Sequence, residues 1–205
     1  NCPFCQAVLD DPRAPVCPAC RPGLPWLKGR AGERRVEFTG GCFSPLAYRD
    51  AVPEAVHRYK FSRVRALGKP FGALMAQCLE EHLPLGAGLI CWAPLSRKRF
   101  RERGFNQAEL LAREVGRLRL IPAQPVLWKM RDTGPQSELE EESARRANAR
   151  GVYSLLPGID LAGKRVVLVD DVVTSGATLG ECAALLCQAG AEAVYGLTLA
   201  QARSD

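Results

Sequence analysis

The stretch VVLVDDVVTSGAT, from Val166 to Thr178, joins an apolar run to a pair of acids and then to small polar residues. Its apolar start predicts a buried strand that ends at the adjacent Asp170 and Asp171. The residues after the acids are expected to form a loop that opens a helix. This connection consists of Val172, Val173, Thr174, Ser175, Gly176, Ala177 and Thr178.

This connection has the chemistry of an anion site. Backbone N–H groups at a helix N-terminus are unpaired and carry partial positive charge, so the loop can hold a phosphate. Gly176 permits close approach of the backbone, and three hydroxyl residues, Thr174, Ser175 and Thr178, add donors. Two carboxylates would repel a phosphate, but they would accept hydrogen bonds from hydroxyl groups of the same ligand. A sugar phosphate satisfies both halves of the stretch.

Two alternatives remain open for this stretch. In a nucleoside-triphosphatase the two acids would hold magnesium, and the segment from Gly158 to Arg165 nearly fits the G-x-x-x-x-G-K-[ST] phosphate loop. However, Arg165 replaces the required hydroxyl residue, and the segment precedes a strand instead of linking a strand to a helix. We interpret Gly163 and Lys164 as a turn. The other alternative is a strand that simply ends in solvated acids.

Four cysteines near the N-terminus have the spacing of a metal site. CPFC (Cys2 to Cys5) and CPAC (Cys17 to Cys20) are two C-x2-C pairs separated by eleven residues. Zinc takes four thiolates at tetrahedral corners, and each pair can supply two of them. Two disulfides or a redox pair are the alternatives. A site closed by four cysteines predicts a structural role for the zinc.

The rest of the chain alternates between helix and strand patterns, which predicts an α/β fold with a mostly parallel sheet flanked by helices. Residues 1–42 are assigned to the zinc-binding module and linker, and residues 43–205 to the α/β domain. Helices are expected near 71–79, 108–115, 137–150 and 179–187, and strands near 88–95, 125–130, 152–156, 166–170 and 193–200.

Composition indicates an ordinary globular protein with a basic surface. The 205 residues are 47% hydrophobic and 24% charged, with a net charge of +6. No apolar run reaches the roughly 20 residues that span a bilayer, and no secretory signal is visible, so we expect a cytoplasmic protein. The run from Arg97 to Arg103 holds five cations in seven residues. Such a cluster attracts nucleic acid or polyphosphorylated small molecules, or is simply a solvated surface.

VVLVDDVVTSGAT resembles the phosphoribosyl pyrophosphate (PRPP) binding motif of type I phosphoribosyltransferases. Three further stretches narrow the resemblance: HRYKF (His57 to Phe61), RKRFRERGFNQAELLA (Arg97 to Ala112) and RDTGPQSELEEESARRAN (Arg131 to Asn148). With the N-terminal cysteines, they make the chain similar to the ComF family of competence-associated, phosphoribosyltransferase-like proteins. The resemblance covers nearly the whole chain.

The resemblance implies a ligand and a place for each of its parts. The ligand would be PRPP with Mg²⁺, with Asp170 and Asp171 on the ribose hydroxyls and Thr174 to Thr178 on the 5′-phosphate. Ser175 stands where many members have a second threonine, so a hydroxyl is retained. The pyrophosphate loop would contain Ser96, Arg97 and Lys98, and a flexible closing loop would contain Arg131, Gln136 and Arg145.

Three functions remain open from the sequence. The resemblance favours a PRPP-binding protein of DNA uptake in natural transformation, with single-stranded DNA and other DNA-processing proteins as partners and a homodimer left open. The second is an active phosphoribosyltransferase of nucleotide metabolism with an unidentified acceptor. The third is a DNA-binding accessory factor with a vestigial pocket. Its DNA-binding candidates are Arg99, Arg101, Arg103 and Phe105, with Phe100 as another ring for stacking.

Two smaller features have both a functional and a plain reading. His57 and Lys60 would lie three residues apart on one helix face, either as a contact to a polyanion or as part of an exposed amphipathic helix. Asn106 precedes a helical stripe, where it either takes part in chemistry or caps the helix, and we expect the cap.

Overall fold

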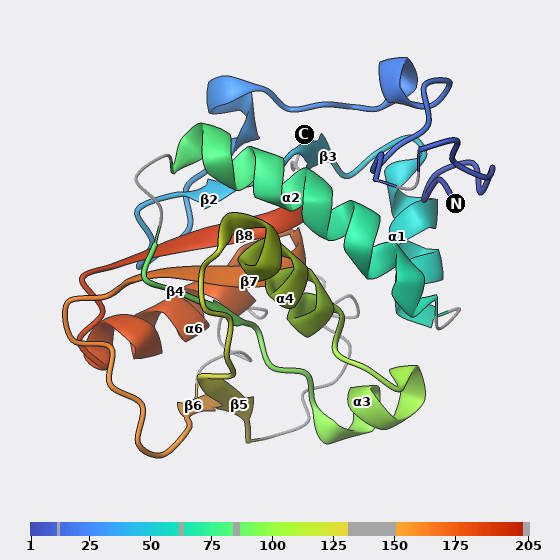
Figure 1. Ribbon diagram of the computed structural model, residues 1–205. Helices are drawn as coiled ribbons and strands as arrows, with labels where there is room; N and C mark the ends of the chain where they lie inside the picture. The colour runs from blue at the N-terminus through green and yellow to red at the C-terminus, as the bar shows by residue number, and fades with distance from the viewer. Residues whose placement is uncertain (12, 62–63, 84–86, 131–150, 203–205) are drawn as a thin grey trace.

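The computed structural model has a central sheet that is covered by helices (Figure 1). It describes residues 1–11, 13–61, 64–83, 87–130 and 151–202. The main sheet has six strands, ordered β1-β2-β8-β7-β4 with β3 also beside β8, and its pairs are parallel except β1 with β2. The strands are β1 (Glu33–Arg34), β2 (Cys42–Phe43), β3 (Leu46–Ala47), β4 (Leu89–Trp92), β7 (Arg165–Val173) and β8 (Ala193–Gln201). The prediction of a mostly parallel sheet is confirmed.

The strand β7 lies in the middle of this sheet and is buried on both faces. Val167 and Val169 belong to one apolar cluster, together with residues of α2 and α4, whereas Val166 and Leu168 belong to a second cluster, with residues of α6. Successive side chains of a strand point to opposite faces. A continuous apolar run is therefore what a strand between two helical layers requires.

The helices begin and end at recognisable signals. Ser96 accepts a hydrogen bond from the backbone N–H of Arg99 at the start of α3, and Gly104, with φ of 78°, ends that helix. None of the helices in the described ranges is long and apolar enough to cross a membrane. The helices are α1 (Val52–Phe61), α2 (Gly68–His82), α3 (Arg97–Arg103), α4 (Gln107–Arg119) and α6 (Ala177–Gln188), with 3-10 turns at Arg21–Gly23, Gly29–Gly32 and Arg65–Leu67.

The structure differs from the sequence-based expectation at one important strand end. The sequence predicts that the strand stops at Asp170, but β7 continues to Val173 because Val172 and Val173 pair with Ala200 and Gln201 of β8. Both acids therefore lie within a strand. The expected strands near 125–130 and 152–156 are found as the antiparallel pair β5 (Leu127–Lys129) and β6 (Tyr153–Leu155). The helix expected near 137–150 lies outside the described residues.

The N-terminal cysteine segment packs onto the main core and shares its apolar cluster. Cys2, Phe4 and Val16 are buried in the same cluster as residues of α1 and α2, and the rings of Phe4 and Phe71 lie 6.1 Å apart. The segment assigned to the linker also supplies β1 and one residue of β2 to the main sheet. The division into residues 1–42 and 43–205 stays a prediction.

Candidate functional site

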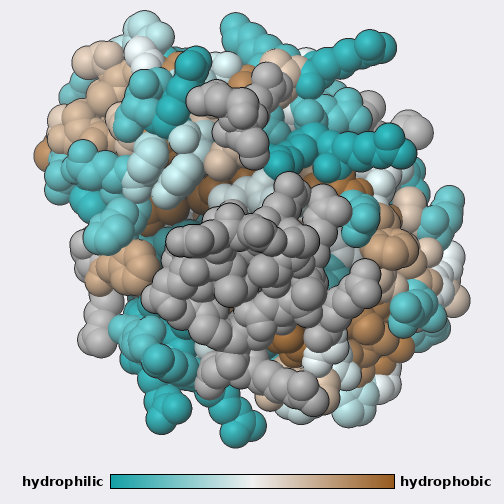
Figure 2. All heavy atoms as spheres, turned by 180° about the vertical axis from the view of Figure 1, so that it is seen from behind, coloured by the Kyte–Doolittle hydropathy of each residue, from teal (hydrophilic) through white to brown (hydrophobic). Residues whose placement is uncertain are grey.

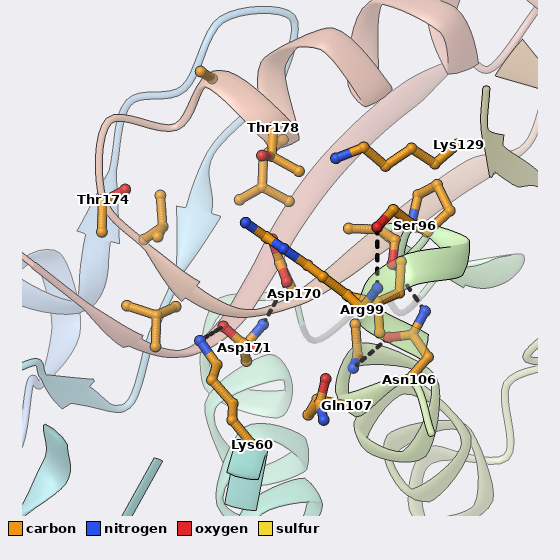
Figure 3. Close-up of a pocket in the computed structure, with 18 of the residues that line it drawn as sticks. Lys60, Ser96, Arg99, Asn106, Gln107, Lys129, Asp170, Asp171, Thr174 and Thr178 are labelled. Carbon is orange, nitrogen blue, oxygen red and sulfur yellow. Dashed lines mark hydrogen bonds and ion pairs between the residues drawn. The ribbon is translucent and has the colours of Figure 1, made fainter. Parts of the chain in front are cut away.

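A cavity of about 250 Å³ opens at the carboxyl ends of β4 and β7 (Figure 3). Ligands of open parallel sheets bind at such ends. The cavity is lined by residues of α1, α3, α4, α6, β5, β6 and β7, together with Tyr48 and the connections after β4 and β7. All residues from Asp170 to Thr178 line it, so the acids, the hydroxyl residues and Gly176 of the stretch face one space, whereas its four apolar residues, Val166 to Val169, lie in the core.

The β7–α6 connection has the form expected of a phosphate loop. Gly176 precedes the first residue of α6 and has φ of 82°, a conformation that favours glycine. A Cβ at Gly176 would lie 3.2 Å from Cγ2 of Val36, so the position is also tight. The backbone N–H of Ala177 donates to Oγ of Ser175 at 3.4 Å. The first N–H groups of α6 thus stand beside hydroxyl groups at the cavity wall.

The two acids differ in their environments. Oδ1 of Asp171 lies 2.7 Å from Nζ of Lys60, and both side chains are mostly buried. Oδ1 of Asp170 accepts a hydrogen bond from the backbone N–H of Asp171 at 2.8 Å. Burial, and next the charge of Asp171, raise the pKa of Asp170 to about 7, although Lys60 and Arg103 act in the opposite direction. At neutral pH the pair therefore carries less than two full negative charges.

The helix α3 presents a different pair of cations to the cavity from the pair expected in the pyrophosphate loop. Ser96 lines the cavity, but Arg97 and Lys98 are exposed and do not. Arg99 and Arg103 line it instead, and Figure 3 shows Arg99 extending across the space toward Thr178. Since residues four apart share a helix face, the helix start at Ser96 decides which arginines point inward.

The DNA-binding candidates are divided by the same geometry. Arg99 and Arg103 face the cavity, whereas Arg101 is exposed on the outside of α3. Phe105 is only 2% exposed, and its ring packs 5.7 Å from that of Tyr59. Its burial leaves no face for a stacked base, which corrects the stacking role that the sequence suggests for Phe105. Arg131, Gln136 and Arg145, assigned to the flexible loop, lie outside the described residues.

Several residues that line the cavity are not among the site residues that the sequence predicts. Nζ of Lys129 lies 5.4 Å from the ring centre of Tyr153, and both residues line the cavity from the β5–β6 pair. Gln107 is 1% exposed, and its Oε1 accepts a hydrogen bond from Arg103 at 3.0 Å. Asn106 caps α4, as expected, by accepting from the N–H of Ala108 at 3.0 Å. In the sequence, only their polarity marks these residues as candidates for a site, because they come together only when the chain folds.

The four N-terminal cysteines form a cluster that fits a metal. Their sulfur atoms all lie within 4.8 Å of one another, and those of Cys5 and Cys17 are 3.6 Å apart. Tetrahedral zinc with Zn–S distances of roughly 2.3 Å would separate its sulfurs by about 3.8 Å. None of these cysteines is in a disulfide. Burial raises the pKa of Cys2, but nearby backbone N–H groups outweigh it and the pKa falls to about 6, which favours the thiolate that a metal binds.

The fold and the cavity define a phosphoribosyltransferase-like protein. The family model described as "Phosphoribosyl transferase domain" matches residues 104–205, which include the β7–α6 connection and β8. Among solved structures, the chain is similar to glutamine PRPP amidotransferase from Bacillus subtilis, with 26% identity and a TM-score of 0.43. That match covers 65% of this chain and 26% of the amidotransferase chain.

The chain belongs to the ComF family of competence-associated, phosphoribosyltransferase-like proteins. It is 36% identical to Competence protein F of Haemophilus influenzae, over 98% of this chain and 90% of that protein. It is 28% identical to Competence protein ComFC of Streptococcus pneumoniae, over 97% of this chain and 80% of that protein. The match to DNA utilization protein YhgH of Escherichia coli, at 32% identity, covers 72% of this chain and 66% of that relative, just under two thirds of its length.

Proposed function

We propose that this competence-associated protein binds PRPP with Mg²⁺ in the cavity at the end of β7. The observation that carries the proposal is the meeting of two acids and a helix N-terminus in one space of about 250 Å³. A ligand that fits must bring hydroxyl groups and a phosphate together, and the phosphoribosyl group does so.

Each part of the ligand has matching groups in the cavity. The 5′-phosphate would lie on Thr174 to Thr178, where backbone N–H groups begin α6. The ribose hydroxyls would donate to Asp170 and Asp171. The diphosphate would lie toward Ser96 and Arg99, and a guanidinium beside it is suited to a dense negative charge.

Two metals belong to the proposal. Mg²⁺ would accompany the diphosphate and neutralise part of its charge, as hard cations do with phosphate oxygens. Zinc would be held by the four-cysteine cluster, where it would have a structural role.

Calorimetric titration of PRPP into the purified protein with Mg²⁺ tests the proposal. We expect saturable binding in the micromolar range, and weaker binding of ribose 5-phosphate because it lacks the diphosphate. Ribose, which has no phosphate, is the control and should give no heat of binding. A folded sample that binds none of the phosphorylated sugars would overturn the proposal.

Single-stranded DNA is a second proposed ligand, and the outward face of α3 supports it. Arg97, Lys98 and Arg101 are exposed there, and Phe100 keeps 48% of its surface accessible. Hydrophilic side chains gather where α3 lies in the rear view, at the lower left of Figure 2. Cations beside an exposed ring are the usual elements of a single-strand site. This face is separate from the arginines that line the cavity.

Arg97→Ala combined with Arg101→Ala tests the DNA face. We expect weaker single-strand binding and a salt dependence whose slope falls by about 1.4, from roughly 0.7 for each lost phosphate contact. Affinity for PRPP should stay unchanged, since neither arginine lines the cavity. Arg49→Ala with Arg117→Ala removes the same charge elsewhere on the surface and is the control. An equal loss of DNA affinity in both double variants would contradict a specific role for α3.

A further inference from the structure

Three consecutive residues of α1 contact three different parts of the protein. Arg58 donates from one guanidinium nitrogen to the carbonyl oxygens of Pro3, at 2.7 Å, and Phe4, at 3.0 Å, both inside the first cysteine pair. The hydroxyl of Tyr59 donates to the backbone carbonyl of Gln107 in α4 at 2.9 Å. Lys60 pairs with Asp171 at the cavity. The helix α1 thus spans the distance from the cysteine cluster to the acids.

The contact between Lys60 and Asp171 is well shielded from solvent. Their side chains are 20% and 13% exposed, and Nζ lies 2.7 Å from Oδ1. An ion pair in such a place interacts more strongly than one on the surface, and removing one partner leaves the other charge buried. Figure 3 shows Lys60 approaching Asp171 from α1, on the side of the cavity away from Thr178.

The charged groups around Asp171 come from three elements. Lys60 of α1 and Arg103 of α3 are positive, whereas Asp170 of β7 is its negative neighbour, and the buried, neutral phenol of Tyr59 in α1 also interacts with Asp171. Without Lys60, Asp171 would face Asp170 without the cation that lies 2.7 Å from it, leaving Arg103 and the other described cations that line the cavity, Arg99 and Lys129, to offset the two acids. Like-charged carboxyls then share a proton up to a higher pH, and a protonated acid is a poorer acceptor for ligand hydroxyls.

The other two residues hold α1 in place. Arg58 is 15% exposed on its side chain and also pairs with Glu54, so its guanidinium joins the helix to the first cysteine pair. Tyr59 is fully buried and packs edge-on against Phe71 with ring centres 5.5 Å apart. A shift of the first cysteine pair would therefore move the helix that carries Lys60.

We propose that Lys60 is a positioning residue of the cavity, keeping Asp171 oriented as an acceptor for sugar hydroxyls, and that Arg58 links its position to the first cysteine pair. This inference rests on the proposed binding of a phosphoribosyl ligand. It adds a residue from α1, outside the matched phosphoribosyl transferase segment, and joins the two candidate sites of the chain.

The first test compares Lys60→Met, Lys60→Arg and the control Lys69→Met in titrations with ribose 5-phosphate. Lys69 is an exposed lysine of α2 away from this cavity, so its loss removes the same charge. We expect Lys60→Met to weaken binding by roughly tenfold or more, Lys60→Arg to restore most of the affinity, and Lys69→Met to change it less than about twofold.

The pH profile of the same titration separates positioning from folding. Affinity should fall at low pH, as the two acids are protonated. Loss of Lys60 should raise the pH at which half of the affinity is lost, because the acids then keep a proton up to a higher pH. The ligand phosphate titrates identically in all variants. If the wild type binds ribose 5-phosphate and Lys60→Met binds it with the same affinity and pH profile, the inference is overturned. The proposed function then remains intact. Absence of binding to the wild type would overturn both.

The second test asks whether Arg58 acts through Lys60. We expect Arg58→Ala to weaken ribose 5-phosphate binding by about threefold in the wild-type background and to have little further effect in Lys60→Met. Such non-additivity is the mark of residues that act in one chain of contacts. Arg49→Ala, at an exposed arginine just before α1, is the control. Equal effects of Arg58→Ala in both backgrounds would contradict the proposed link.

Discussion

The cysteine cluster and the cavity are built in opposite ways. The cluster gathers four side chains of one kind from residues 2–20, and its ligand atoms lie within 4.8 Å of one another. The cavity gathers acids, cations, hydroxyls and backbone N–H groups from residues as distant as Tyr48 and Leu179. The cluster can hold a metal through short-range geometry alone, whereas the cavity exists only after the sheet has formed.

The two regions contribute differently to stability and to binding. A small N-terminal segment can bury little apolar surface within itself, so a metal there supplies folding free energy besides its packing onto the main core. The cavity keeps unlike charges close together in a half-buried place, which stabilises a ligand more than the fold. Substitutions in the cluster should therefore act mainly on stability, and substitutions in the cavity mainly on binding.

The largest effect is expected at the cluster. Cys17→Ser removes a buried ligand, and we expect loss of bound metal and destabilisation of the N-terminal segment by about 5 kcal/mol or more. Metal analysis by mass spectrometry and thermal unfolding give the two readouts. Cys187→Ser, at an exposed cysteine outside the cluster, is the control and should change neither. Full metal content in Cys17→Ser would contradict a four-cysteine site.

Gly176→Ala should affect both binding and stability. The positive φ and the close approach of Val36 together cost about 1–2 kcal/mol, and the displaced loop should bind ribose 5-phosphate more weakly. Gly158→Ala is a matched control, because Gly158 has φ of 75° but a Cβ there would meet nothing within 4 Å. If the two variants bind equally well, the loop is not the phosphate site.

The sequence predicts one part of the cavity and not the rest. The β7–α6 connection is contiguous, so its acids, hydroxyls and Gly176 stand side by side in the sequence and predict the site together. The end of β7 could not be predicted, because it depends on pairing of Val173 with Gln201 in β8. Strand register between distant segments leaves no local pattern.

The cations show the same limit. The basic run is plain in the sequence, but whether Arg97 or Arg99 faces the cavity depends on where α3 begins. Phe105 looks like a stacking ring until α1 brings Tyr59 against it. Lys60 reaches Asp171 across more than a hundred residues of sequence, and only packing of α1 reveals that contact.

A smaller effect is expected in the pH dependence of the free energy of unfolding, which should reveal the raised pKa of Asp170. Folding raises the pKa of Asp170 from 3.8 to about 7, so the folded protein binds more protons between these values. The stabilisation that protonated Asp170 gives to the fold is fully present below pH 3.8 and is lost as the pH rises toward 7. Asp170→Asn should thus be more stable than wild type at pH 8, by about 1–2 kcal/mol for this half-buried group, and the gain should shrink at pH 5.

Thermal unfolding at the two pH values measures this gain. The Asn side chain keeps an oxygen that can accept from the N–H of Asp171, so the backbone contact is retained. Asp160→Asn, on an exposed turn, is the control and should show no such pH dependence. A gain that is equal at pH 5 and pH 8 would show that Asp170 is not perturbed.

The most direct test of the account is titration of PRPP into the variant carrying Asp170→Asn and Asp171→Asn, beside the wild type. We expect the wild type to bind and the double variant to lose at least roughly a hundredfold in affinity, with circular dichroism showing that the variant is folded although Lys60 has lost its partner. Asp50→Asn with Glu192→Gln, two exposed acids, removes the same charge and should keep wild-type affinity. Unchanged affinity in the double variant of the acid pair would contradict the central claim that these acids hold the ribose of a phosphoribosyl ligand.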